Sequence, residues 1–386
     1  MLSPDEVLDV IDQGEGRSVE FKGSRVNNDS LSQEIVAFAN SDGGVLLVGI
    51  GDDGGIIGAD LNDDFEEIVC NLVRTNVIPA LDIFYHELSI EGKKVAVIEI
   101  PKGKDKPYQT NTGRYYVRVG STKRIATQAE LLRLFQAAGV FHYDLTPVEG
   151  SSIGDLNFSK LDSYFGRYGF DIGRQTEEQR RTLLRNTNII TDEGALTVAG
   201  LLIFGLSPSR FLPQTGISFA VFRGRELGAE LLDKQNLEGT LDYLVDTCAA
   251  LLKSHVKMPS KIEGTKRICE VHTYSDRTIR EVLTNALVHR NYSIYGSKIR
   301  VFLFSDRLEV ISPGRLPNTV GVDSLRYGVS FAANPVIVKI MENLSYVDQL
   351  GRGLPMVYQE ATSHSKRVEF KEVGEEFRVI LGLQPI

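Results

Sequence analysis

Several features that would narrow the class of protein are missing from this sequence. The chain of 386 residues has only three cysteines, Cys70, Cys248 and Cys269, which lie far apart without a CxxC or Cys/His pattern. Neither a disulfide framework nor a structural zinc site is expected, and reduced thiols in a cytoplasmic protein are the simplest interpretation. No apolar run approaches the ~20 residues of a membrane helix. The first ten residues are acidic and lack the pattern of a secretion signal.

An overall positive charge is also lacking, although the charge is unevenly distributed. The net charge is −8, and residues 1–140 account for all of it, with 14 Lys and Arg against 22 Asp and Glu. Residues 102–124 nevertheless form a basic island in which three tyrosines interleave with the cations. Such a segment suits a phosphate backbone with unstacked bases, but a solvated hairpin edge explains it equally well. The candidate nucleic-acid residues are Lys106, Tyr108, Arg114, Tyr115, Tyr116, Arg118, Lys123 and Arg124.

The periodicity of the apolar residues predicts an α+β protein in three parts: residues 1–140, a connecting module at 141–210, and residues 211–386. In the first part, the apolar run 45–50 is typical of a strand buried on both faces. The connecting module carries no recognisable chemistry, and its segment 197–204 is a short helix or a buried strand. Helices are expected at 4–11, 31–40, 64–76, 127–139, 176–186, 237–253 and 277–291, and strands at 18–22, 94–100, 114–119, 217–223, 298–304, 308–311, 368–371 and 377–383.

One glycine motif has the spacing of a dinucleotide-binding site but lacks the helix that such a site needs. Gly49, Gly51 and Gly54 follow the strand 45–50 with the GxGxxG spacing. That fingerprint needs a helix to open at its end, so that backbone N–H groups face the pyrophosphate. No helical pattern follows here, and we predict a β-hairpin with Asp52 and Asp53 at its tip.

The predicted helix 277–291 carries a polar line beside its apolar face. Glu281, Asn285 and His289 fall at i, i+4 and i+8, and the apolar residues fall on the stripe that packs against a sheet. A carboxylate, an amide and an imidazole in line are suited to hold a metal-bound phosphate and its water. A solvated helix edge, with Arg277 and Glu281 paired at i,i+4, is the alternative that spacing alone favours.

A second group of charges lies in the first part of the chain. Glu15, Glu20, Lys22 and the pair Asp52 and Asp53 would form a site for a divalent ion if they converged, with Lys22 beside a scissile phosphate. Glu20 and Lys22 share one face of their strand because side chains repeat every two residues. Taken alone, ordinary surface charges are the simpler interpretation.

Four separated segments of residues 14–140 resemble the Schlafen/AlbA-type domain. They are VEFKGS, EIVAFANSDGG, VLLVGIGDDGGIIG and KPYQTNTGRYYVRVGS, in that order. The resemblance implies nucleic-acid binding, and some Schlafens are metal-dependent ribonucleases that use two glutamates and an aspartate. Glu15 and Glu20 match the paired glutamates in type and spacing, and Asp52 or Asp53 matches the aspartate. Many prokaryotic relatives with this fold are labelled transcriptional regulators.

Residues 270–365 resemble the ATP-binding domain of the GHKL class, in the form found in predicted transcriptional regulators. The matching segments are REVLTNALVHRNY, LEVISPGRLP and YVDQLGRGLPMVYQEA. The resemblance implies an α/β sandwich in which Glu281 activates water and Asn285 completes the coordination of Mg²⁺. Gly314 would belong to the first glycine loop, near adenine. Gly351 and Gly353, in the segment 349–355, would approach the phosphates closely.

Ser312 departs from the GHKL pattern, which has an aspartate two residues before the first glycine. Serine can accept the hydrogen bond of the adenine amino group, but without charge. Losing a charge-assisted bond costs about 1.5–3 kcal/mol, or roughly ten- to a hundredfold in affinity. Weak ATP binding, or a vestigial pocket, is therefore consistent with the sequence.

The sequence leads to three hypotheses about function. The first is a nucleotide-responsive, cytoplasmic regulator that binds DNA or RNA through residues 1–140 and ATP·Mg²⁺ through residues 211–386, as a homodimer. The second is a nuclease that depends on Mg²⁺ or Mn²⁺ and uses Glu15, Glu20 and Asp52 or Asp53. The third is a structural oligomer with two vestigial sites. Weak ATPase activity through Glu281 is compatible with the first two.

Overall fold

The computed structural model describes residues 2–60, 64–255, 260–263, 266–269, 274–329, 331–348 and 351–385. Gln349 and Leu350, at the start of the expected second glycine segment, lie outside these ranges. The chain divides into two units, Met1–Phe141 and His142–Ile386, and each has hydrophobic core of its own. No helix among the described residues is both long and apolar enough to cross a membrane.

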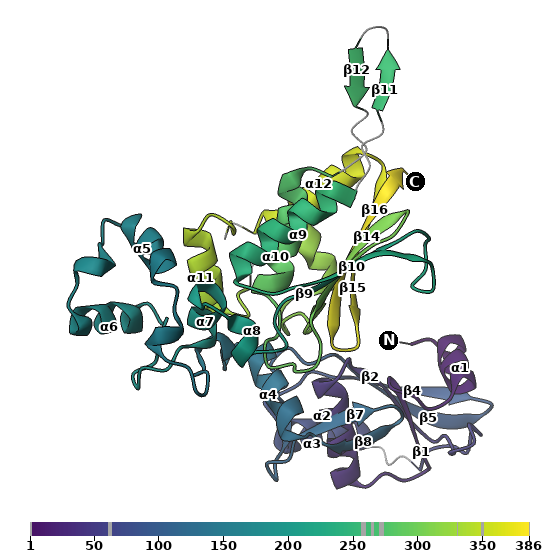
Figure 1. Ribbon diagram of the computed structural model, residues 1–386. Coiled ribbons are helices and arrows are strands. Elements are labelled where there is room, and N and C mark those ends of the chain that lie inside the picture. The colour runs from purple at the N-terminus through teal and green to yellow at the C-terminus, as the bar shows by residue number, and fades with distance from the viewer. Residues whose placement is uncertain are drawn as a thin grey trace. The chain divides into compact units, whose positions relative to one another are not determined.

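Unit 1 is built on a four-stranded mixed sheet with the order β1-β2-β5-β4, in which only β1 and β2 run parallel. Figure 1 shows it at the purple end of the chain. Its elements are α1 (Pro4–Gln13), β1 (Val19–Lys22), α2 (Asn28–Asn40), β2 (Gly44–Val48), α3 (Phe65–Asn76), β3 (Val77–Ile78), β4 (Phe84–Ile90), β5 (Lys93–Ile100), β6 (Gln109–Thr110), β7 (Tyr116–Val119), β8 (Thr122–Ile125) and α4 (Gln128–Ala137).

The central position of strand β2 explains why its sequence is almost continuously apolar. Leu46 and Val48 point into the core that contains α2, while Leu47 points into the core that contains α1. Both faces of the central strand are therefore buried, as the sequence predicts. After β2, Ile50 and Ile56 form an antiparallel bridge around a turn, and no helix occurs in residues 49–60. The hairpin is confirmed, and the GxGxxG spacing is not a dinucleotide site.

Unit 2 contains a six-stranded mixed sheet with the order β10-β9-β13-β14-β16-β15. Its elements are η1 (Tyr143–Leu145), η2 (Ile153–Asp155), α5 (Phe158–Gly166), η3 (Ile172–Arg174), α6 (Glu177–Asn186), α7 (Val198–Phe204), α8 (Pro208–Phe211), β9 (Ile217–Phe222), β10 (Leu231–Leu237), α9 (Leu241–His255), β11 (Ser260–Glu263), β12 (Lys266–Cys269), α10 (Asp276–Val288), β13 (Ile299–Leu303), β14 (Arg307–Pro313), η4 (Val322–Tyr327), α11 (Pro335–Asn343), α12 (Gly353–Ser363), β15 (Lys366–Val373) and β16 (Glu376–Pro385).

Helices α9, α10 and α12 pack against one face of this sheet (Figure 1). The α+β class and the layered sandwich of the C-terminal part are confirmed. The segment 197–204 is the helix α7, whose N-cap Thr197 accepts a hydrogen bond from Gly200 N. Leu161 of α5 and Leu201 of α7 lie in the same core as Val301 of β13. The residues expected to form a separate connecting module therefore share the core of unit 2.

Candidate functional site

The predicted polar line lies on α10, and two contacts fix the start of that helix. Ser275 is the N-cap, and its side chain accepts a hydrogen bond from Thr278 N. Glu360 of α12 in turn accepts hydrogen bonds from Ser275 N and from the hydroxyls of Ser275 and Thr278. The apolar stripe of α10, represented by Val282 and Leu287, is buried in the core. This packing directs the polar edge of α10 away from the sheet.

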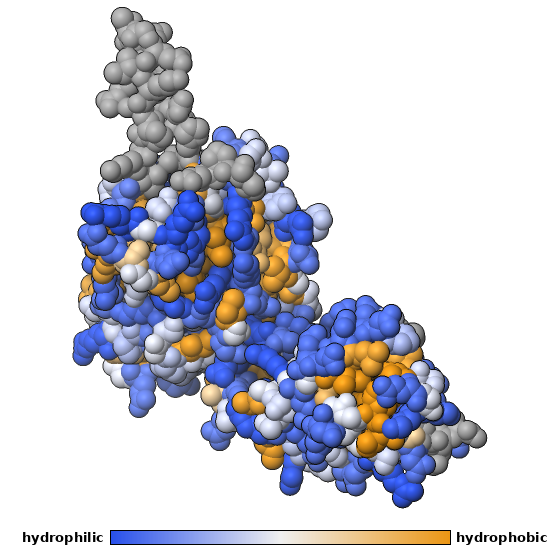
Figure 2. Space-filling model, turned by 90° about the vertical axis from the view of Figure 1, so that its right-hand side faces the viewer, coloured by the Kyte–Doolittle hydropathy of each residue, from blue (hydrophilic) through white to orange (hydrophobic). Residues whose placement is uncertain are grey.

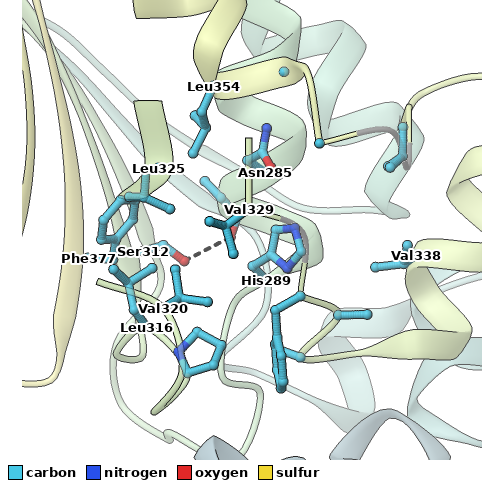
Figure 3. A pocket seen from close by; sticks show the side chains of 18 of the residues that line it. Asn285, His289, Ser312, Leu316, Val320, Leu325, Val329, Val338, Leu354 and Phe377 are labelled. Atoms are coloured by element: carbon cyan, nitrogen blue, oxygen red, sulfur yellow. Dashed lines mark hydrogen bonds between the residues drawn. The ribbon is translucent and has the colours of Figure 1, made fainter. Parts of the chain in front are cut away.

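All the predicted nucleotide residues line one cavity of about 540 Å³. They come from three places that the fold brings together: α10, the end of β14, and the start of α12. Figure 3 shows Asn285, His289 and Ser312 facing the same space, with apolar side chains around them. The solvated helix edge, which spacing alone favours, is therefore not what α10 presents. The predicted residues in the lining are Glu281, Asn285, Ser312, Gly314, Gly351 and Gly353.

Glu281 and Asn285 form a pair in the cavity wall. The amide Nδ2 of Asn285 donates to the backbone oxygen of Glu281 and to its Oε1, both at 2.8 Å. Both amide hydrogens are thus directed at Glu281, which leaves Oδ1 as the amide atom that can bind a ligand. Burial raises the pKa of Glu281 above its ordinary value. A carboxylate with a raised pKa beside a fixed amide is suited to general-base chemistry.

Gly353 allows this carboxylate to sit against the start of α12. A Cβ at position 353 would lie 1.6 Å from Oε1 of Glu281 and 2.4 Å from its Cδ. Any residue with a side chain would therefore displace the carboxylate. The N-cap of α12, Arg352, makes no side-chain capping bond, and Gly353 and Leu354 line the cavity. The first N–H groups of a helix carry its positive end, which attracts anions.

Ser312 and Gly314 shape the opposite end of the cavity. Ser312 is buried, and its hydroxyl donates a 2.8 Å hydrogen bond to the backbone oxygen of Ala286 on α10. Because that proton is used, Ser312 can only accept from a ligand. Gly314 has φ +121°, and a Cβ there would lie 2.8 Å from the Cβ of Asn291. Glycine is therefore required where β14 passes the end of α10.

His289 also lines the cavity, although the sequence gives it no firm role. Its ring is open to the cavity (Figure 3), where a neutral imidazole would offer one donor and one acceptor.

The apolar wall of the cavity is the part that sequence reasoning missed. It comes mainly from the segment 316–338, including η4, for which no site was predicted. Gly328 and Gly351 fix this segment over α12, since a Cβ on either would lie 2.9–3.0 Å from the carbonyl oxygen of the other. The only indication of this wall in the sequence is a run of apolar residues that follows neither the helical nor the strand period. The wall includes Leu316, Val320, Leu325, Val329, Val338 and Leu354.

The predicted carboxylate site of unit 1 has a different arrangement. Oε2 of Glu20 accepts from Arg118 Nη1 at 2.6 Å, while Lys22 Nζ bonds to Oε1 of the same carboxylate. Glu34 of α2 pairs with Arg118 at 3.1 Å and with Lys123 at 2.6 Å. Burial alone would raise the pKa of Glu20, but the hydrogen bonds from Lys22 and Arg118 outweigh it and lower that pKa. This is a buried ion-pair cluster in which protein cations balance the carboxylates.

The other predicted carboxylates lie outside this cluster. Glu15 is exposed and its Oε1 accepts from Phe21 N at 2.9 Å, while Asp53 accepts from Gly55 N within the hairpin turn. Asp52 is exposed at the same turn. Among the described residues, no group of three or more His, Cys, Asp or Glu side chains is arranged to hold a metal ion.

The structure corrects the expectation that the basic island lies at one surface. Lys106, Tyr108, Tyr116 and Arg118 are buried, with 1–7% of each residue exposed. Asn40 of α2 explains part of this, because its amide bonds to backbone groups of Tyr108 and Tyr116 at 2.7–2.9 Å and holds them in the interior. Arg114 and Arg124 are exposed, while Tyr115 and Lys123 are half-buried.

Two family models match separate parts of the chain. A model described as "Schlafen, AlbA_2" matches residues 15–127, and a model described as "Putative ATP-dependent DNA helicase recG C-terminal" matches residues 296–381. The chain thus joins a Schlafen/AlbA_2 domain in unit 1 to a RecG-related C-terminal domain in unit 2. The second match includes Ser312, Gly314, Gly351 and Gly353 and begins after α10. A comparison with curated proteins gave no match.

A comparison with solved structures also gave matches. The DIP2311 protein from Corynebacterium diphtheriae has 24% sequence identity, with 96% of this chain and 76% of that chain covered and a TM-score of 0.48. The N-terminal domain of a putative ATP-dependent DNA helicase RecG-related protein from Nitrosomonas europaea also has 24% identity. That match covers 33% of this chain and 95% of the domain, with a TM-score of 0.26.

Proposed function

We propose that this protein binds ATP·Mg²⁺ in the cavity of unit 2 and nucleic acid through unit 1, as a nucleotide-responsive regulator. The strongest support for nucleotide binding is that residues from three separate parts of unit 2 meet at one cavity. Residues that the sequence indicates as nucleotide contacts, from α10, from the end of β14 and from the start of α12, line a single cavity. Its mixture of a large apolar wall and a few polar groups is typical of a small-molecule site.

The cavity residues fit the parts of a magnesium nucleotide. The apolar wall around Leu325 and Val329 suits a base, and Ser312 can accept a hydrogen bond from an exocyclic amino group. The positive end of α12 at Gly353 suits the phosphates. Oδ1 of Asn285 is an oxygen ligand of the kind that Mg²⁺ prefers. Bound Mg²⁺ would neutralise phosphate charge and hold the phosphates in place.

The charges of the lining give an independent reason for a divalent cation. Glu281, Glu342 and Asp348 contribute carboxylates, while Arg315 and Lys339 contribute the cations. A triphosphate alone would meet a lining with no excess of positive charge and would be repelled by the carboxylates. A triphosphate with Mg²⁺ carries less negative charge, and its Mg²⁺ can accept an oxygen ligand from the protein. We therefore expect binding of ATP to require Mg²⁺.

Calorimetry with ATP tests the nucleotide proposal directly. Wild type should bind ATP in the presence of Mg²⁺ and not in EDTA, and Asn285→Ala should weaken binding at least ~10-fold because it removes the amide ligand. Asn186→Ala, at the exposed end of α6, is the matched control and should bind like wild type. Absence of binding heat in wild type, or unchanged affinity in Asn285→Ala, would refute the proposal.

For unit 1 we favour binding of nucleic acid over cleavage, because both oxygens of Glu20 already pair with protein cations. Arg114→Gln/Arg124→Gln should weaken binding of a labelled oligonucleotide in fluorescence anisotropy and lower its salt dependence. The exposed pair Arg25→Gln/Arg74→Gln is the control. Equal affinity of the two double variants would contradict a role of the basic island in binding nucleic acid. Cleavage of the oligonucleotide in Mg²⁺ or Mn²⁺ would favour the nuclease alternative.

A further inference from the structure

The six-stranded sheet of unit 2 has a second face that the proposed function leaves unused. Helices α9, α10 and α12 cover one face, and side chains at the alternate positions of each strand point to the other. On this open face, side chains such as Arg300, Phe302 and Arg378 are half-buried. Figure 2 shows it as alternating hydrophilic and hydrophobic stripes that follow the strands.

Cations form a row across this face. Arg300 of β13 and Arg378 of β16 are both register partners of Ile311 on β14, and Lys371 of β15 is the partner of Arg378. Neighbouring strands are about 4.8 Å apart, so Arg300 and Arg378 start roughly 10 Å from one another. Arg307 of β14 adds a further cation to the same face, four residues before Ile311.

The carboxylates on this face are fewer than the cations and lie deeper. Glu376 pairs with both Arg300 and Arg378, Glu369 pairs with both Arg367 and Lys371, and Glu309 pairs with Arg307. The side chains of Glu376, Glu369 and Glu309 are 24%, 16% and 13% exposed, whereas those of their cationic partners range from 26% for Arg307 to 67% for Arg367. The outermost layer of the face is therefore positive, although the net charge of the whole chain is −8.

Aromatic rings lie beside the cations on the same face. Phe222 of β9 stacks on Phe304 with ring centroids 5.0 Å apart, and Phe302 of β13 meets Phe222 edge to face at 5.8 Å. The guanidinium of Arg307 lies 4.0 Å from the ring centroid of Phe304. Phe304 is buried, whereas Phe222 and Phe302 are half-buried.

We propose that this open face binds single-stranded nucleic acid, with phosphates along the row of cations and bases against Phe222 and Phe302. A sheet that presents aromatic rings beside exposed cations combines the two contacts that single strands need, which are stacking and charge neutralisation. A second copy of the chain is a poorer occupant, because the same positive outer layer on both partners would be brought together.

The test uses the full chain and a fluorescein-labelled 20-nucleotide strand of mixed sequence, as RNA and as DNA, with anisotropy measured at several salt concentrations. Arg367→Gln/Arg378→Gln removes two cations, while Lys371 and Arg300 keep a partner on each carboxylate. The Kd should rise about fivefold or more for RNA and DNA alike, and the salt slope should fall by about 1.4, since each phosphate contact contributes ~0.7. Phe302→Leu should raise the Kd about fivefold or more through lost stacking.

The matched control is Arg185→Gln/Lys253→Gln, which removes two exposed cations of unit 2 from α6 and α9. It should leave the Kd and the salt slope unchanged. Affinities equal to the control in both open-face variants would overturn the proposal. A change of sedimentation mass in these variants with unchanged oligonucleotide affinity would also overturn it, because the face would then be a contact between copies of the chain.

Discussion

Replacing Gly353 by alanine isolates the contact on which the proposed nucleotide site depends. Gly353 is the first residue of α12, so alanine suits its helical backbone. The new Cβ would nevertheless lie 1.6 Å from Oε1 of Glu281 and 2.4 Å from its Cδ. The carboxylate must therefore rotate away, and its 2.8 Å hydrogen bond from Asn285 is lost. The variant changes the geometry of the polar pair without removing either functional group.

The expected cost to stability is small because two effects oppose each other. A hydrogen bond to a charged group contributes about 1.5–3 kcal/mol, and alanine in place of glycine in a helix returns up to about 1 kcal/mol. A net loss of about 1 kcal/mol would lower the melting temperature by roughly 2–4 °C for a unit of this size. Binding of ATP·Mg²⁺ should fall by at least ~10-fold, because Glu281 and the Cβ would occupy space beside the phosphate end of the cavity.

Calorimetry and thermal melting separate the two effects. Gly166→Ala at the end of α5, where a Cβ would have no neighbour within 4 Å, is the matched control and should bind ATP·Mg²⁺ like wild type. Gly353→Ala with unchanged affinity would show that the position of the Glu281 carboxylate is irrelevant to the ligand. A melting temperature lowered by more than about 10 °C would show that the contact is chiefly structural.

Two further predictions concern buried carboxylates. Burial raises the pKa of Glu281 above its ordinary value. As the pH rises from the ordinary pKa through the raised pKa, ionisation of this carboxylate therefore lowers the free energy of unfolding. Glu281→Gln should therefore melt higher than wild type at pH 8 and equally at pH 4, and a lower melting temperature at pH 8 would refute this reasoning. Arg118→Met removes the buried guanidinium that pairs with both Glu20 and Glu34, which keep Lys22 and Lys123, and should cost about 3 kcal/mol in urea unfolding. Arg25→Met, at an exposed position, should cost under ~0.5 kcal/mol, and equal costs would mean that the cluster contributes nothing.

The repeating patterns of the sequence predict those elements on which burial imposes a period, and they miss β4, α5, β10 and α11. The apolar run of β2 corresponds to a strand with a core on each side, and the stripe of α10 corresponds to a helix on a sheet. Glu281, Asn285 and His289 of α10 line one cavity for the same reason, because periodicity fixes which residues share an edge. The residues that lie across the cavity from this edge are indicated by the family resemblance, and the periodicity of the sequence does not predict them.

The burial of Tyr108 and Arg118 was not predictable from local sequence. Clustered cations and tyrosines indicate an exposed surface only if no other element competes for them, and α2 does so here. Asn40 holds the backbone of Tyr108, and Arg118 lies 4.5 Å from the ring of Phe38 while pairing with Glu34. These contacts join residues more than 65 positions apart. A buried ion pair has the same composition as a surface one and differs only in what packs around it.

Helix α12 explains how the cavity and α10 depend on one another. Glu360 holds the start of α10 through Ser275, and Gly353, seven residues earlier on α12, lies against Glu281. The two contacts are about 10 Å apart along α12, so the helices run antiparallel and touch at two levels. A ligand that binds the N-terminus of α12 therefore acts on a helix that also caps α10. Any ligand that binds only when α12 occupies this position will stabilise both contacts together. The fold thus provides unit 2 with a physical route by which a ligand bound in the cavity would affect the start of α10.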